Sequence, residues 1–251
     1  MDEKVIAELL GERLRNKIHY FDSIDSTNSR LKELALNGAP EGTLVIADAQ
    51  TAGRGRLGRS FVSEKGRGVY MSVLLRPDCR ADEAPGLTAN AAAAVCRALD
   101  RFGVNAQIKW VNDVFLGGRK ICGILCESAV GSDGRLSYAV IGVGLNVLGD
   151  GFPPEIRDIA GSVQSQSGLV LPREKLCSEI YRELKDMYSA WKKDPACYIE
   201  DYRRRSLLTG KSVRIGNETA AVLGISDDFG LTVSTHGGVK ILRCGEVSVK
   251  L

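Results

Sequence analysis

The sequence lacks the long apolar runs and the apolar leader that mark membrane proteins and secreted proteins. No stretch of its 251 residues approaches the roughly 18 uninterrupted apolar residues of a membrane-spanning helix. The N-terminal segment MDEKVIAELLGERLRNK carries charge throughout and has no apolar core of the kind found in a signal peptide. These absences predict a protein that stays in the cytoplasm and does not enter a membrane.

Histidine is scarce, and cysteine is not arranged as a metal site or a disulfide framework. His19 and His236 are the two histidines, and the seven cysteines include no C-x-x-C pair. A zinc site therefore has few ligands available, and no metal ligand is assigned. An odd number of scattered cysteines predicts reduced, mostly buried thiols. Cys122 and Cys126 are expected to share one face of a strand with Ile124, in the core.

The charge is nearly balanced, whereas glycine is abundant. The formal net charge is +3 and the pI is about 8.4, well short of the concentrated positive charge of a dedicated nucleic-acid-binding protein. The 28 glycines gather around residues 53–68 and 142–151. This clustering indicates that the backbone comes close to another group in these two segments.

The hydrophobic periodicity predicts an α+β protein. Helices are expected over 1–16, from 25–27 to 38, 83–102 and 173–193, and strands over 18–24, 43–48, 68–76, 106–110, 113–116, 119–129 and 136–147. Short turns at 117–118 and 131–134 join successive strands as hairpins, which predicts a largely antiparallel, mixed sheet flanked by helices. Four or five short strands after residue 207 indicate a small β-barrel. The expected domains are therefore 1–206 and 207–251.

The most informative stretch is QTAGRGRLGR, at residues 50–59. Gly53, Gly55 and Gly58 satisfy the G-x-G-x-x-G pattern of dinucleotide-binding folds. However, no helical periodicity follows over 59–70, so no helix N-terminus is available to receive a pyrophosphate. The dinucleotide-binding interpretation is therefore excluded, and no Walker A sequence is present.

Three arginines alternate with these glycines. The glycines permit left-handed backbone and close approach, while Arg54, Arg56 and Arg59 can bind phosphate or carboxylate oxygens in a bidentate manner. The segment is expected to be mobile without an anion and to order and close on one. A solvated basic loop that binds nucleic acid is the alternative.

Three other segments each allow two interpretations. Lys109, beside Trp110 in a strand, either faces inward toward an anion or ends the strand in water. Gly142 and Gly144 lie on one face of a strand, where either a ligand or a packed helix can approach. Residues 26–28, Ser-Thr-Asn, either cap a helix or bind a ligand.

Five motifs occur in a fixed order and together resemble one family. They are D-S-T-N at 25–28, Q-x-x-G-R-G-R-x-G-R at 50–59, K-W-x-N-D at 109–113, K-x-x-G-I-L at 120–125 and G-x-G-x-N at 142–146. In this order they resemble the biotin–protein ligase, or biotin–[acetyl-CoA-carboxylase] ligase, family. The resemblance spans about 18–206 and implies a class II synthetase-like catalytic domain with an SH3-like C-terminal barrel.

The sequence departs from the family pattern at two positions. Val111 replaces the usual proline, and Phe61 stands where a tryptophan usually follows the arginine segment. Phe61 still leaves an aromatic face for adenine. Few residues precede Asp25, so the resemblance implies the monofunctional type, which lacks an N-terminal DNA-binding domain and does not bind DNA.

The resemblance implies an ATP-dependent ligase. Such an enzyme forms biotinyl-5'-AMP from biotin and Mg²⁺-bound ATP, and then transfers biotin to a lysine of a biotin carboxyl carrier protein. The implied biotin-binding residues are Ser26, Thr27, Asn28, Gln50, Gly53, Arg54, Gly55, Arg56, Lys109, Gly123, Gly142 and Gly144. The implied ATP-binding and adenylate-binding residues are Arg56, Arg59, Phe61, Lys109 and Asn146. Lys109 and Arg54 are the predicted catalytic residues, with Lys109 at the carboxylate and α-phosphate oxygens.

Several alternatives stay open at this point. A lipoate or octanoate ligase shares the implied fold and the lysine, and a regulator that senses the adenylate without transferring it is a non-enzymatic alternative. The oligomeric state is open between a monomer and a homodimer. Asp113 is a candidate for the base in the transfer step, although Asn112-Asp113 is equally a turn signal.

Overall fold

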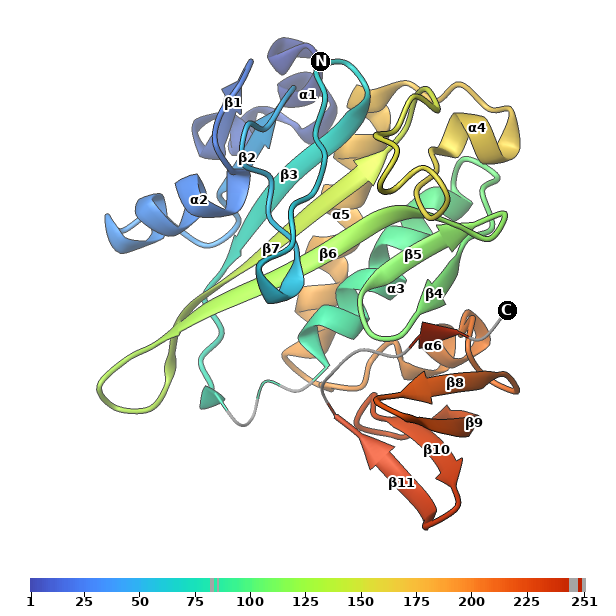
Figure 1. Cartoon of the computed structure of the whole chain (residues 1–251). Helices are drawn as coiled ribbons and strands as arrows, with labels where there is room; N and C mark the ends of the chain where they lie inside the picture. The colour runs from blue at the N-terminus through green and yellow to red at the C-terminus, as the bar shows by residue number, and fades with distance from the viewer. Residues whose placement is uncertain (82–83, 85, 244–247, 250–251) are drawn as a thin grey trace.

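A seven-stranded mixed sheet forms the centre of the computed structural model, which describes residues 1–81, 84, 86–243 and 248–249 (Figure 1). Its order is β1 (Ile18–Phe21), β2 (Leu44–Ala47), β3 (Gly68–Leu75), β7 (Leu136–Asn146), β6 (Arg119–Val130), β5 (Asp113–Leu116) and β4 (Gln107–Lys109). β1 pairs with β2 in parallel, and the other neighbours pair antiparallel. The predicted α+β class and the largely antiparallel, mixed sheet are confirmed.

Helices cover both faces of this sheet. The helical elements are α1 (Glu3–Leu10), η1 (Glu12–Lys17), α2 (Thr27–Leu36), η2 (Arg56–Gly58), α3 (Leu87–Asp100), α4 (Val163–Ser167), α5 (Arg173–Trp191) and α6 (Ile199–Arg204). α3 and α5 pack together on one face, and α2 packs on the opposite face against β2, β3 and β7. The cavity described below lies on the face that α2 covers.

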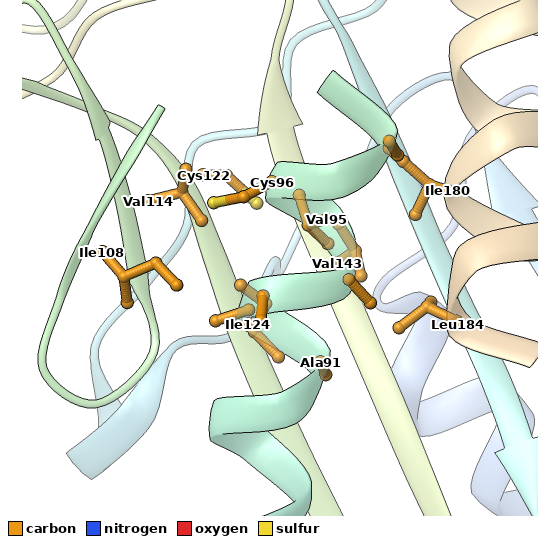
Figure 2. Close-up of a cluster of buried hydrophobic side chains, with 14 of the residues drawn as sticks. Ala91, Val95, Cys96, Ile108, Val114, Cys122, Ile124, Val143, Ile180 and Leu184 are labelled. Atoms are coloured by element: carbon orange, nitrogen blue, oxygen red, sulfur yellow. The ribbon is translucent and has the colours of Figure 1, made fainter. Parts of the chain in front are cut away.

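The core between the sheet and α3 depends on small side chains. α3 buries Ala91, Ala94 and Ala98 completely, so the helix can approach the sheet closely. Figure 2 shows Ile124 and Val143 of the sheet beside α3, and Ile180 and Leu184 of α5 pointing toward the same cluster.

The N-terminal helix is shorter than predicted. α1 ends at Leu10 because Gly11 adopts a left-handed φ of 89°, and the chain continues as the 3₁₀ turn η1. A continuous helix over 1–16 is therefore wrong. The short helices α4 and α6 fall in segments for which the periodicity predicted no element.

A second, antiparallel sheet follows α6. It contains β11 (Gly238–Leu242), β10 (Leu231–Thr235), β9 (Glu218–Ile225), β8 (Ser212–Ile215) and β12 (Ser248–Val249), in that order. Trp110 Nε1 donates to the carbonyl of Phe229 at 2.8 Å, and the Tyr202 ring meets the Phe229 ring edge-on at 5.5 Å. The predicted short strands are thus observed, while their closure as an SH3-like barrel stays a prediction.

The cysteines of the described residues are free thiols, half of them buried. Cys79, Cys96, Cys122, Cys126, Cys177 and Cys197 are free thiols, and Cys244 lies outside the described residues. Burial raises the pKa of the Cys96 and Cys177 thiols to about 12, so both stay protonated at neutral pH. No helix in the part of the chain that the structure describes is long and apolar enough to span a membrane.

The packing of α5 on the core gives a first prediction. Leu184 is 1% exposed, and its replacement by alanine leaves a cavity in a region distant from the arginine segment. We expect Leu184→Ala to lower the free energy of unfolding by about 2–5 kcal/mol. Urea unfolding measures this change.

Leu36→Ala is the matched control, because Leu36 is 75% exposed at the end of α2. Its effect should stay within about 0.5 kcal/mol. Equal free energies of unfolding for the two variants would contradict the assigned core.

Candidate active site

A cavity of about 540 Å³ lies between the arginine segment and the sheet. The predicted site residues that line it are Ser26, Thr27, Asn28, Gln50, Arg54, Gly55, Arg56, Arg59, Phe61, Lys109, Gly123, Gly142, Gly144 and Asn146. Gly53 does not line the cavity, because it is buried behind the segment. The structure therefore brings the five sequence motifs to one place.

The floor of the cavity is a row of residues across four strands. Gly144 of β7 pairs with Gly123 of β6, Gly123 pairs with Asp113 of β5, and Asp113 pairs with Lys109 of β4. Residues directly opposite each other in antiparallel strands point to the same face of the sheet. This register places two glycines, a carboxylate and an ammonium on one surface.

Side chains from two other segments pack against the backbone of Gly142 and Gly144. A Cβ atom on Gly142 would lie 2.2 Å from Asn28 Oδ1, and one on Gly144 would lie 2.7 Å from the Phe61 ring. Packing of a helix residue therefore explains Gly142, and packing of an aromatic ring explains Gly144. Both glycines also line the cavity, so close packing and ligand access occur at the same strand.

The arginine segment is a compact turn. Gly55 N–H donates to the Arg59 carbonyl at 2.7 Å, and Phe61 N–H donates to the Gly53 carbonyl at 2.9 Å. A Cβ on Gly53 would meet the Phe61 carbonyl at 2.3 Å, so Gly53 permits close approach. Among the three glycines only Gly58 has a left-handed φ, of 74°, so left-handed backbone occurs at Gly58 and close approach at Gly53.

Two of the arginines already contact protein groups. Arg54 Nη1 lies 3.4 Å from Glu127 Oε1, and Arg56 Nη1 donates to Asn112 Oδ1 at 3.0 Å. Asn112 in turn donates to the Ile124 carbonyl at 2.9 Å. The segment thus contacts the rest of the protein at two points, through Arg54 and Arg56.

The start of α2 caps the helix and also lines the cavity. Ser26 is the N-cap, and its Oγ accepts from Ser29 N–H at 3.4 Å. Thr27 and Asn28 in the first turn are each 4% exposed, and both line the cavity. The Thr27 amide donates to Gln50 Oε1 at 2.9 Å, which joins α2 to the arginine segment.

Lys109 faces the cavity from β4. It is partly buried, and its Nζ lies 5.8 Å from the centroid of the Phe115 ring. The alternative of a strand-end lysine in water is therefore not what the structure shows. On β7, Asn146 Nδ2 donates to the Gly161 carbonyl at 3.1 Å, and this residue also lines the cavity.

Lys120 lines the same cavity and was given no role from the sequence. Strict alternation along β6 would place Lys120 and Gly123 on opposite faces. However, the register between β5 and β6 shifts at Val114 and Phe115, so that Phe115 pairs with Lys120. This β-bulge turns Lys120 toward the cavity, where its Nζ lies 2.8 Å from Asp113 Oδ1.

The C-terminal part of the chain adds one more cation. Lys211, just before β8, lines the cavity together with Leu207. No periodicity connects position 211 with the motifs of residues 25–146, so sequence reasoning gave no signal for it. Lys120, by contrast, was visible in the K-x-x-G-I-L motif.

Comparison with known proteins identifies the family. The model of the biotin/lipoate A/B protein ligase family matches residues 20–146. The bifunctional ligase/repressor BirA of Bacillus spizizenii is 36% identical over 96% of this chain and 75% of that protein. The biotin–[acetyl-CoA-carboxylase] ligase of Mycobacterium tuberculosis is 31% identical over 88% of this chain and 85% of that protein.

A solved structure agrees with these relatives. The biotin protein ligase of Aquifex aeolicus, in complex with biotin and ATP, is 29% identical with a TM-score of 0.80, covering 93% of this chain and 98% of that chain. The chain belongs to the biotin/lipoate A/B protein ligase family. The predicted family and the predicted ligase class of enzyme are confirmed.

The two glycines of β7 give a second prediction, because their neighbours differ in mobility. Asn28 is held by hydrogen bonds to Leu125, Glu127 and Ser72, whereas Phe61 presents the far end of a ring. We expect Gly142→Ala to destabilise the fold by about 1–3 kcal/mol and Gly144→Ala by less.

Urea unfolding of both variants measures the difference. A Gly142→Ala protein as stable as the wild type would show that Asn28 is not fixed as described.

Proposed function

We propose that the protein activates biotin with ATP to form biotinyl-5'-AMP and transfers biotin to the ε-amine of a lysine on a biotin carboxyl carrier protein. One observation carries this proposal. A single cavity joins a polar end, built by the start of α2 and Gln50, to the basic side chains of the arginine segment, Lys109 and Lys120. The named relatives are ligases of this kind, and the Aquifex enzyme holds biotin and ATP.

The polar end suits the ureido group of biotin. A ureido group has one carbonyl acceptor and two N–H donors, so a matching site needs both a donor and acceptors. The Ser26 capping bond uses an oxygen lone pair and leaves the hydroxyl proton for a ligand. Thr27 and Gln50 supply further polar atoms beside it, and Arg54 adds a positive charge at the same end.

The basic end suits the nucleotide and the reacting phosphate. Arg56 and Arg59 supply guanidinium groups for phosphate oxygens, and Asn146 lies on the neighbouring strand. Phe61, whose ring packs on Gly144, offers an aromatic face for adenine. Lys211 extends the positive charge toward the C-terminal sheet.

The reaction requires positioning and charge stabilisation. The biotin carboxylate attacks the α-phosphorus of Mg²⁺-bound ATP, and pyrophosphate leaves as the mixed anhydride forms. The carrier amine then attacks the acyl carbon, and AMP leaves. Neither step needs a nucleophile from the protein, because bound cations lower the barrier where negative charge accumulates.

Lys120 joins Lys109 as a candidate for this charge stabilisation. Its ammonium lies beside the glycine floor, 3.4 Å from the position of a Cβ on Gly123, and Asp113 fixes it by an ion pair. Asp113 forms an ion pair with Lys120, so we assign Asp113 to hold that lysine in place and not to act as the base in the transfer step.

We also propose a domain boundary near Ser206, an SH3-like barrel after it, a cytoplasmic location and a biotin carboxyl carrier protein as the partner. The protein acts either as a monomer or as a homodimer. The barrel proposal is supported by the five-stranded antiparallel sheet after α6.

Substitution of the cavity cations gives a third prediction. Removal of one preorganised donor typically costs about 2.7–4 kcal/mol, or about 100- to 1,000-fold in rate. We expect Lys120→Ala, Lys109→Ala and Arg54→Ala each to slow biotinyl-AMP formation by such a factor in single-turnover assays. Lys65→Ala is the control, because Lys65 is a solvent-exposed lysine that does not line the cavity.

The outcome separates the two lysines. A wild-type rate for Lys109→Ala together with a large loss for Lys120→Ala would remove Lys109 from the catalytic set, and the reverse result would remove Lys120. Unchanged rates for all three variants would contradict the role of the cavity in activation.

A direct test of the function combines radiolabelled biotin, ATP and a biotin carboxyl carrier domain. Labelled carrier is the expected product. Free adenylate without labelled carrier would favour a sensor of the adenylate, and transfer of octanoate but not of biotin would favour a lipoate or octanoate ligase.

A further inference from the structure

A carboxylate next to the polar end of the cavity contacts three side chains, two from α2 and one from the arginine segment. Glu127 lies on β6, and its side chain is 21% exposed. Its Oε1 accepts from Lys32 Nζ at 2.8 Å and lies 3.4 Å from Arg54 Nη1, while its Oε2 accepts from Asn28 Nδ2 at 2.9 Å. One side chain thus joins two turns of α2 to the arginine segment.

These contacts keep Glu127 ionised. Burial alone would raise the pKa of the Glu127 carboxyl, but the hydrogen bonds from Lys32 and Asn28 and the charge of Arg54 outweigh burial and lower this pKa. At neutral pH the carboxylate therefore only accepts hydrogen bonds.

The ionised carboxylate fixes the orientation of the Asn28 amide. Asn28 Nδ2 lies 2.9 Å from Glu127 Oε2 and 3.2 Å from the Leu125 carbonyl, and both of these groups only accept. The amide nitrogen must face them, so Asn28 Oδ1 faces Ser72. The Ser72 hydroxyl then donates to Asn28 Oδ1 at 2.6 Å.

This donation determines the direction of the next hydrogen bond. Ser72 is completely buried, and its hydroxyl has one proton, which Asn28 takes. Ser72 Oγ lies 2.8 Å from Thr27 Oγ1, a distance at which one of the two must donate. Thr27 is therefore the donor to Ser72 Oγ. A second protein acceptor, Gln50 Oε1, lies 3.2 Å from Thr27 Oγ1, so the Thr27 proton is used within the protein.

The same chain continues to the arginine segment on its other side. Gln50 Oε1 accepts from the Thr27 amide at 2.9 Å, and Gln50 Nε2 donates to Ser63 Oγ at 2.8 Å. Ser63 in turn donates to the Phe61 carbonyl at 3.1 Å. The hydrogen bonds therefore reach the backbone at Phe61, just after the arginine segment, while Glu127 contacts the segment itself at Arg54.

From this geometry we propose that Glu127 is a positioning residue for biotin, which directs the Thr27 hydroxyl through Asn28 and Ser72 and holds Arg54 at the cavity. This inference rests on the proposed function. Because the Thr27 proton is used by Ser72, Thr27 presents only lone pairs to the cavity, and the matching ligand group is an N–H donor such as a ureido nitrogen.

A neutral residue at position 127 no longer fixes the orientation of the Asn28 amide. Glutamine can present either its carbonyl oxygen or its amide nitrogen to Asn28, so the Asn28 amide is free to reverse. Reversal changes the direction of the Ser72 and Thr27 hydrogen bonds. The Thr27 proton is then released from Ser72 and is shared between Gln50 Oε1, 3.2 Å away, and a bound ligand, so Thr27 no longer presents only lone pairs to the cavity. Loss of the charge also weakens the contact with Arg54.

The test is the dependence of biotinyl-AMP formation on biotin concentration at saturating ATP. For Glu127→Gln we expect the KM for biotin to rise about 10- to 100-fold, the range typical of a lost hydrogen bond to a charged group. We expect the KM for ATP to stay within about threefold of wild type, because Glu127 contacts no group assigned to the nucleotide. Any fall in kcat should stay well below that of Arg54→Ala, because the Arg54 guanidinium is retained. Glu33→Gln is the control. Glu33 lies on α2, as Asn28 does, and its exposed carboxylate pairs with Arg30.

A double-mutant cycle identifies the route of the effect. Ser72→Ala interrupts the chain between Asn28 and Thr27 and should also raise the KM for biotin. If Glu127 acts through Ser72, the double variant should have a KM well below the product of the two separate increases. If Glu127→Gln does not fold, Ser72→Ala alone carries the test through the same KM for biotin.

Three results would overturn the proposal. They are an unchanged KM for biotin in folded Glu127→Gln, a loss confined to kcat, and independent effects in the double variant. A readout without ligand separates this proposal from the function itself. By NMR, the Asn28 side-chain amide protons should exchange with solvent slowly in wild type and faster in Glu127→Gln.

These exchange rates do not depend on biotin. A wild-type enzyme that forms no biotinyl-AMP would defeat the proposed function, whereas equal exchange rates in wild type and Glu127→Gln would defeat the positioning role of Glu127.

Discussion

The central constraint on this structure is the concentration of positive charge in one partly buried cavity. Arginines 54, 56 and 59 and lysines 109, 120 and 211 all line it, although the whole chain has a net charge of only +3. Like charges repel, and burial removes the water that would screen them. Asp113 and Asp158 line the cavity too, but the six cations outnumber them. The arrangement is therefore most favourable when an anionic group binds among the cations, and this is the physical basis on which a nucleotide and an acyl-adenylate are proposed as its ligands.

Rigid elements bring these charges together. The register of β7, β6, β5 and β4 sets the glycine floor beside Lys109, and a single bulge brings Lys120 to the same face. Ion pairs and hydrogen bonds then limit the freedom of individual cations, as Asp113 does for Lys120 and Asn112 does for Arg56. Preorganisation of this kind avoids the cost of ordering the side chains during the reaction.

Much of this arrangement could be predicted from local sequence patterns. The alternation of apolar residues located the long strands β6 and β7, and the five motifs contain more than half of the residues that line the cavity. Lys120 was missed because a bulge reverses the face on which it lies, and bulges depend on the pairing of two strands. Glu127 was missed because an acidic residue near the end of a strand is typical of a solvated surface, and its three partners come from segments distant in sequence.

Glycine illustrates the same limit. A G-x-G pattern in a strand predicts that something approaches the backbone, but it does not tell which group does so. Here Asn28 and Phe61 both approach β7, and each also lines the cavity. Protein packing and exposure to the cavity are therefore not alternatives at this strand, since the same side chains do both.

The most direct test of the central claim is a crystal structure with a sulfamoyl analogue of biotinyl-adenylate. The sulfamoyl group should lie within hydrogen-bonding distance of a cavity lysine and of at least one guanidinium group of the arginine segment, with the ureido group beside Thr27. An analogue bound elsewhere, or bound here with its sulfamoyl group away from every one of these cations, would contradict the account.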